Sequence, residues 1–95
     1  MTKYEMLYIL TAESTDEVKE GIIAKFEQLV KDNGGEVESI DKWGVKKLAY
    51  AIDYKTEGYY VLMTFQSEPT LIAELDRIAG INENVLRRLI TKRNA

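Results

Sequence analysis

The sequence contains no cysteine and no histidine, and these two absences remove most of the common catalytic chemistries. Without cysteine there are no disulfides and no thiolate nucleophiles, and without histidine there is no Ser-His-Asp triad. Zinc sites built on cysteine or histidine are excluded for the same reason. We therefore expect no catalytic residue, no metal site and no cofactor.

Long apolar runs are also missing, since none approaches the roughly 20 residues that a membrane-spanning helix needs. Residues 1–5 lack the anatomy of a signal peptide, and the absence of cysteine suits a reducing compartment. We therefore expect a cytoplasmic protein without membrane contact. A length of 95 residues predicts one small domain. Such a domain has little core volume to spare for a small-molecule substrate.

The net charge of −3 argues mildly against nucleic acid, but the charges are unevenly placed. Acidic residues gather between positions 13 and 32. No acidic residue follows Glu83, whereas four basic residues do: Arg87, Arg88, Lys92 and Arg93. Because charges in solution are screened within about 10 Å, a chain that is acidic overall can still present a basic surface to RNA.

The first third of the chain predicts a strand and a helix. Residues 4–10 are rich in aromatic and β-branched side chains, as is typical of a strand. Ser14 and Glu17 have the spacing of a capping box at the start of a helix. An apolar stripe at helical spacing follows, made of Val18, Ile22, Phe26, Leu29 and Val30. Asn33-Gly34-Gly35 predicts the helix end.

The rest of the chain predicts a hairpin, a second helix and a last strand. Residues 36–54 alternate as a strand does, and the phase slips at Trp43-Gly44, where glycine suits a β-bulge. Residues 53–58 are typical of a hairpin connection, and residues 59–65 of its second strand. A helix should then begin near Pro69 and stop at Gly80. Residues 85–91 predict the final strand.

This β-α-β-β-α-β order predicts the α+β class and a ferredoxin-like fold, with a four-stranded antiparallel sheet and both helices on one face. No helix would cover the other face of that sheet. Several strands are nevertheless apolar at nearly every position. An exposed apolar surface of this kind marks a binding site.

Residues 41–50 contain a Trp-Gly pair, two adjacent lysines and then Leu-Ala-Tyr. This pattern resembles the signature of one family, bacterial small-subunit ribosomal protein six. The other similar segments are residues 4–5, 33–37, 57–62 and 83–87. Ala51 stands where the family commonly has proline. Because this change touches no charge, we expect it to leave function intact.

The resemblance implies a ferredoxin-like ribosomal protein over residues 1–95, located in the ribosome. It implies binding to the central domain of 16S ribosomal RNA, as a heterodimer with small-subunit ribosomal protein eighteen. The RNA-binding candidates are the basic residues Lys3, Lys46, Lys47, Arg87, Lys92 and Arg93. The protein-interface candidates are Trp43, Tyr60 and Arg88.

Several of these candidates also have an ordinary structural explanation. Lys46 and Lys47 suit an edge strand guarded against aggregation, and a lone tryptophan such as Trp43 is more often a core residue. Neighbours on a strand point to opposite faces. Arg87 and Arg88 therefore cannot both reach one partner, and one of them should lie against the helices.

Three other functions compete with RNA binding of this kind. An acylphosphatase needs a basic, glycine-rich phosphate loop after its first strand, but residues 11–17 are acidic. An RNA-recognition motif would stack bases on its third strand, but Glu57 and Val61 replace the basic and aromatic residues that it uses. A regulatory or small-ligand-binding domain that dimerises through its sheet stays open. Gel filtration with and without the protein partner measures the oligomeric state and distinguishes this dimerising domain from the RNA-binding component.

Overall fold

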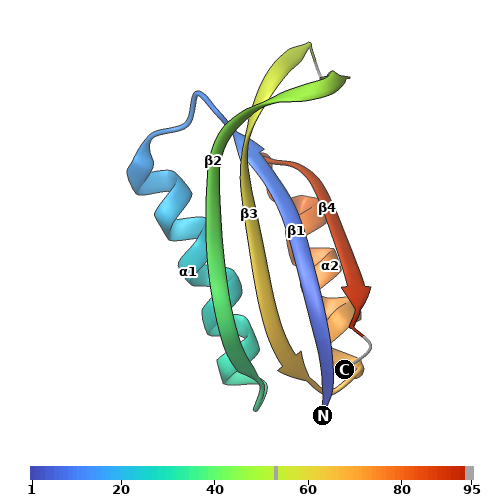
Figure 1. Cartoon of the computed structure of the whole chain (residues 1–95). Coiled ribbons are helices and arrows are strands. Elements are labelled where there is room, and N and C mark those ends of the chain that lie inside the picture. Colours follow the sequence, from blue (N-terminus) through green and yellow to red (C-terminus); the bar gives the residue numbers. More distant parts are fainter. Residues whose placement is uncertain (53, 94–95) are drawn as a thin grey trace.

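The computed structural model describes residues 1–52 and 54–93, which form one antiparallel sheet and two helices (Figure 1). The elements are β1 (Thr2–Thr11), α1 (Asp16–Asp32), β2 (Glu36–Ile52), β3 (Lys55–Ser67), α2 (Thr70–Ile81) and β4 (Val85–Lys92). The strand order is β2-β3-β1-β4, and both helices lie on one face of the sheet. The predicted ferredoxin-like α+β fold is confirmed. Neither helix is long and apolar enough to cross a membrane.

The core lies between the sheet and the helices. Met6, Tyr8 and Leu10 alternate along β1 and are fully buried against the helices. The ring of Tyr8 meets that of Phe26 in α1 edge to face, with centroids 5.0 Å apart. Because strand side chains alternate between faces, the residues between these three point to the opposite face. That face, which carries no helix, is called the open face below.

The start of α1 differs from the prediction by one residue. Thr15, not Ser14, is the N-cap, and its hydroxyl accepts a hydrogen bond from the Val18 amide at 3.2 Å. The Ser14 hydroxyl instead donates to the Thr11 carbonyl at 2.7 Å. The prediction of Ser14 as the N-cap was therefore wrong by one residue, because the Ser14 hydroxyl instead closes the loop between β1 and α1.

The buried stripe of α1 also differs at its first turn. Val18 was expected in the core but is 40% exposed. Lys19 and Ile23 are buried in α1 instead. The aliphatic stem of a lysine can cover apolar surface while its ammonium group reaches polar partners. Lys19 does this here, since its ammonium group hydrogen-bonds to backbone carbonyls before the helix.

The β2–β3 hairpin is tighter than predicted. Ile52 already pairs with Lys55, so residues 55–58 belong to β3 and not to a connecting loop. Of the two residues between these strands, Asp53 lies outside the described residues, and Tyr54 has a positive φ of 65°. The predicted bulge is confirmed, because the register shifts between Lys42 and Gly44.

Gly80 does not end α2, which continues to Ile81. A Cβ atom at Gly80 would lie 2.9 Å from a guanidinium nitrogen of Arg88. The Nε atom of Arg88 donates to Asp76 of the same helix at 2.9 Å. The glycine therefore makes room for an arginine from β4, which explains its presence inside a helix.

The buried hydroxyl of Tyr8 yields a first prediction. It has no hydrogen-bond partner among the described residues. Burial and the nearby Glu20 and Glu27 raise the pKa of this phenol, so it stays protonated. Tyr8→Phe removes an unmatched polar group, and we expect it to raise the free energy of unfolding by about 1 kcal/mol. Urea denaturation measures the change.

The control is Tyr54→Phe, which removes the hydroxyl of a fully exposed ring. It should leave the free energy of unfolding within about 0.5 kcal/mol of the parent. A loss of stability in Tyr8→Phe would show that its hydroxyl is hydrogen-bonded in solution.

Candidate nucleic-acid and protein interface

The open face carries an apolar groove, which we call the open-face groove. The walls of this groove are formed by Leu7, Ile9, Tyr60 and Leu89, and its volume is about 260 Å³. Arg87 and Arg88 of β4 border it. Leu89 is 58% exposed although it lies within a strand. An uncovered apolar surface in a sheet is the feature that the strand pattern predicted.

One transverse row of the sheet organises this face. Ile9 of β1 lies opposite Tyr60 of β3 on one side and opposite Arg87 of β4 on the other. Tyr60 in turn lies opposite Gly44 of β2. The strand order therefore brings together residues that are far apart in the sequence.

Trp43 lies beside this row and not in the core. Its indole stacks on the ring of Tyr60, with centroids 6.2 Å apart and planes 11° apart. Tyr60 lies opposite Gly44, which has no side chain to cover the tyrosine ring. The β-bulge at this point turns the side chain of Trp43 toward that ring. The ammonium group of Lys46 lies 5.2 Å from the centroid of the indole. Trp43 keeps 44% of its surface exposed, as an interface residue can.

Arg87 crosses the open face toward the end of β2. Its Nη1 atom donates to the hydroxyl of Tyr50 at 2.7 Å, and its guanidinium carbon lies 6.0 Å from the centre of that ring. Arg88 points to the other side, where it pairs with Asp76. The expectation that these two arginines diverge is confirmed. The role of Arg88 in a protein interface stays a prediction.

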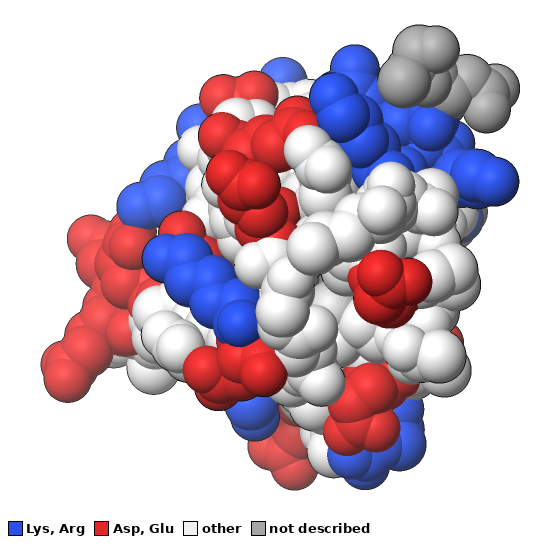
Figure 2. Space-filling model, turned by 90° about the horizontal axis from the view of Figure 1, so that it is seen from below, with Lys and Arg blue, Asp and Glu red and all other residues white. Residues whose placement is uncertain are grey.

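The six basic candidates form two groups at opposite ends of the sheet. Lys46, Lys47 and Arg87 lie near the end that carries the β2–β3 hairpin. Lys3, Lys92 and Arg93 lie where the two termini meet, and the Arg93 amide donates to the Lys3 carbonyl at 2.8 Å. Lys3 and Ile9, which lies opposite Arg87, are six positions apart on β1. This spacing corresponds to about 20 Å along a strand. Figure 2 looks onto the terminal end and shows basic side chains gathered in one corner of it.

Acidic partners that the local sequence did not reveal neutralise part of the terminal group. Arg93 pairs with Glu5 at 3.0 Å, and Lys3 with Glu38 at 3.5 Å. A hydrogen bond from Gln66 lowers the pKa of Glu38, and the charge of Lys3 adds to the effect.

The other four basic candidates have no such acidic partner among the described residues and are therefore more accessible to a phosphate group of a ligand. Within residues 1–52 and 54–93, no carboxylate lies within ion-pair distance of Lys46, Lys47, Arg87 or Lys92. Lys42, the other lysine near the bulge, is bound to Glu20 of α1 at 2.7 Å, which raises its pKa. The hairpin group is therefore the less neutralised of the two.

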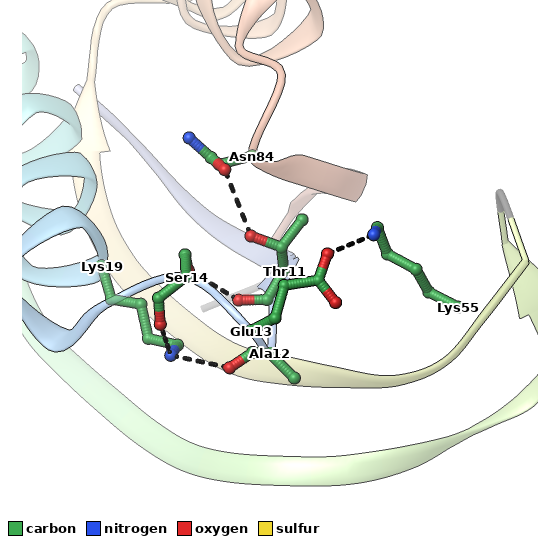
Figure 3. Close-up of polar contacts among 7 residues, drawn as sticks. All are labelled: Thr11, Ala12, Glu13, Ser14, Lys19, Lys55 and Asn84. Atoms are coloured by element: carbon green, nitrogen blue, oxygen red, sulfur yellow. Dashed lines mark hydrogen bonds and ion pairs between the residues drawn. The ribbon is translucent and has the colours of Figure 1, made fainter.

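The loop between β1 and α1 is closed by its own contacts (Figure 3). The buried ammonium group of Lys19 donates to the carbonyls of Ala12 at 3.0 Å and Ser14 at 2.6 Å. Glu13 pairs with Lys55 of β3. A phosphate cradle needs inward-pointing amide groups, whereas carbonyl oxygens converge here on a lysine. The arrangement disfavours the acylphosphatase alternative.

Two exposed tyrosines near the hairpin were missed by the sequence analysis. Tyr50 is 64% exposed, and Tyr54 is fully exposed. Tyrosines in a strand pattern suggest packing, but β2 extends past the helices. Figure 1 shows the β2–β3 hairpin extending beyond both helices, so Tyr50 and Tyr54 have no helix to pack against.

Comparison with known proteins identifies the family. The family model of ribosomal protein S6 matches residues 3–92. Small ribosomal subunit protein bS6 of Thermoanaerobacter pseudethanolicus is 47% identical over 92 residues, which cover 97% of each chain. The protein of the same name from Clostridium acetobutylicum is 46% identical over 90 residues and 95% of each chain.

A solved structure agrees with the fold. The crystal structure of 30S ribosomal protein S6 from Thermotoga maritima superposes with a TM-score of 0.91. It covers 97% of this chain and 87% of its own, at 20% sequence identity. The matched family model and these relatives together show that the chain belongs to the ribosomal protein S6 family of the small ribosomal subunit.

Proposed function

We propose that this member of the S6 family binds 16S ribosomal RNA in the ribosome of the cytoplasm, as a heterodimer with small-subunit ribosomal protein eighteen. Family membership gives it a structural role in the small subunit. The observation that carries the finer proposal is the open face, where an uncovered apolar groove adjoins Arg87. No carboxylate of residues 1–52 and 54–93 lies within ion-pair distance of this arginine.

The open-face groove and the adjoining Trp43–Tyr60 stack suit a protein partner. Apolar side chains of a partner would fill the groove and remove surface such as that of Leu89 from water. Large aromatic residues at the centre of an interface contribute most of its binding energy. RNA contacts of this chain would then lie at the edges of the covered area.

The hairpin group of cations suits phosphate contacts. Arg87 uses one of its five N–H donors on Tyr50, which holds the guanidinium in place, and its other donors have no partner among the described residues. Lys46 adds a mobile point charge on the same face, and Lys47 adds one on the opposite face of β2. The terminal group, about 20 Å away along β1, would contact a different part of the RNA.

The overall charge of −3 gives the isolated chain little general attraction for RNA. We expect a basic partner to supply much of that attraction, so the chain alone should bind weakly and the pair should bind well. Equal affinity of the chain and the pair for the central-domain RNA would contradict the proposal.

The proposal predicts the salt dependence of RNA binding. Lys46→Ala, Lys47→Ala and Arg87→Ala should each lower the slope of log affinity against log salt by about 0.7–0.9, because each removes one phosphate contact. Affinity should fall similarly for all RNA sequence variants, since phosphate contacts do not read bases. The measurement is titration of central-domain RNA with the reconstituted pair at several salt concentrations.

The matched control is Lys25→Ala, which removes an exposed lysine from α1. It should leave the slope unchanged, because α1 covers the face of the sheet away from the groove. Wild-type slopes in all three variants would show that the charges of Lys46, Lys47 and Arg87 face only solvent. A homodimer of the isolated chain that persists when protein eighteen is added would instead favour a domain that dimerises through its sheet.

A further inference from the structure

Tyr54 occupies an unusual position at the tip of the β2–β3 hairpin. Its φ of 65° lies in the left-handed region, where glycine, asparagine and aspartate are much more frequent than tyrosine. Its side chain is 101% exposed, so the ring gains nothing from packing within the described fold. Strained residues of this kind cluster at binding sites.

The surroundings of Tyr54 narrow the kind of ligand. Tyr50, 64% exposed, lies four residues earlier, which is at most about 13 Å along a strand. Arg87 is held against the ring of Tyr50. Lys46 and Lys47 come shortly before Tyr50 on β2. In the described part of the chain, no carboxylate pairs with these cations. Exposed aromatic rings beside such cations suit a ligand that combines planar rings with negative charge.

We infer that the hairpin tip is a stacking platform for an unpaired nucleobase of RNA. The Tyr54 ring provides the stacking face, and Arg87 with Lys46, which lies on the same face of the sheet, holds phosphates of neighbouring nucleotides. The inference rests on the proposed RNA binding and adds the structural class of the RNA. Bases inside a duplex already stack on each other and offer no free face to a tyrosine, so the contacted nucleotide belongs to a loop, a bulge or a single strand.

Tyr54→Gly tests the inference in a way that separates binding from folding. Glycine adopts a positive φ without strain, so the melting temperature should stay unchanged or rise. The affinity of the reconstituted pair for a single-stranded RNA of about 12 nucleotides should fall by about 5- to 50-fold, as expected for the loss of one stacked base. A 2-aminopurine base in that RNA reports stacking directly, and its quenching by the pair should disappear in the variant.

Two further variants isolate the ring. Tyr54→Phe keeps the aromatic face and should bind as the parent does. In Tyr54→Asn, the new side chain tolerates the left-handed conformation but has no aromatic ring. This variant should bind the single-stranded RNA as weakly as Tyr54→Gly does. A duplex RNA of the same length should bind equally to all four proteins.

The inference is overturned if Tyr54→Gly binds the single strand as tightly as the parent, or if Tyr54→Phe loses as much affinity as Tyr54→Gly. It is also overturned if Tyr54→Gly weakens pairing with protein eighteen in the absence of RNA, since the tip would then be a protein contact. The proposed function fails by different results, namely unchanged salt slopes in the Lys46, Lys47 and Arg87 variants.

Discussion

Trp43→Ala should weaken pairing with protein eighteen by about 2–4 kcal/mol, which corresponds to a roughly 30- to 900-fold loss of affinity. The indole lies on the open face, stacked on Tyr60 beside the open-face groove. An aromatic side chain that becomes fully covered by a partner is a typical hot spot. Calorimetric titration of the two purified proteins, without RNA, measures the loss.

The matched control is Val45→Ala. Val45 is 51% exposed on the same strand, but it lies opposite Tyr59, whose side chain packs against the helix-facing core. It should change pairing by less than about 0.5 kcal/mol. Equal losses in the two variants, or an unchanged affinity in Trp43→Ala, would place the protein partner elsewhere on the molecule.

Gly35→Ala should lower the free energy of unfolding by about 2–3 kcal/mol. Gly35 joins α1 to β2, and a Cβ atom there would lie 2.6 Å from the Gln66 carbonyl oxygen and 2.7 Å from a methyl group of Val30. The Gly35 amide also donates to the Val30 carbonyl at 2.9 Å, which fixes the backbone at this point. Because the nearest atom belongs to the backbone, a side-chain rotation cannot relieve the clash.

Gly21→Ala is the same substitution with the opposite expected sign. Gly21 lies in α1, and no atom lies within 4 Å of the position of an added Cβ. Alanine should therefore stabilise the protein by up to about 1 kcal/mol through helix propensity. Urea denaturation measures both variants. A cost below about 1 kcal/mol for Gly35→Ala would show that the junction between α1 and β2 can relax.

Local patterns in the sequence predicted the elements and the bulge. A phase slip next to glycine predicted the register shift at Gly44, because strand alternation and glycine conformation are properties of neighbouring residues. The divergence of Arg87 and Arg88 followed from the same alternation. These features depend on sequence neighbours, and the structure agrees with them.

Features that depend on distant segments could not be predicted in this way. The acidic partner of Arg93 is Glu5, which lies at the other end of the sequence and is adjacent only because β1 pairs with β4. Lys19 is buried because backbone carbonyls of the preceding loop converge on it, and no periodicity reports such a contact. The exposure of Tyr50 and Tyr54 likewise depends on how far β2 extends past the helices.

The position of β1 in the sheet has a consequence for the synthesis of the protein. β1 leaves the ribosome before the other three strands of the sheet, yet both of its neighbours, β3 and β4, come later in the chain than α1 and β2. At about 5–20 residues per second, several seconds pass before Lys92 is added and the last partner strand is complete. A nascent chain thus carries the apolar β1 without its full set of neighbours, and the sheet cannot close until β4 has been synthesised and has left the ribosome.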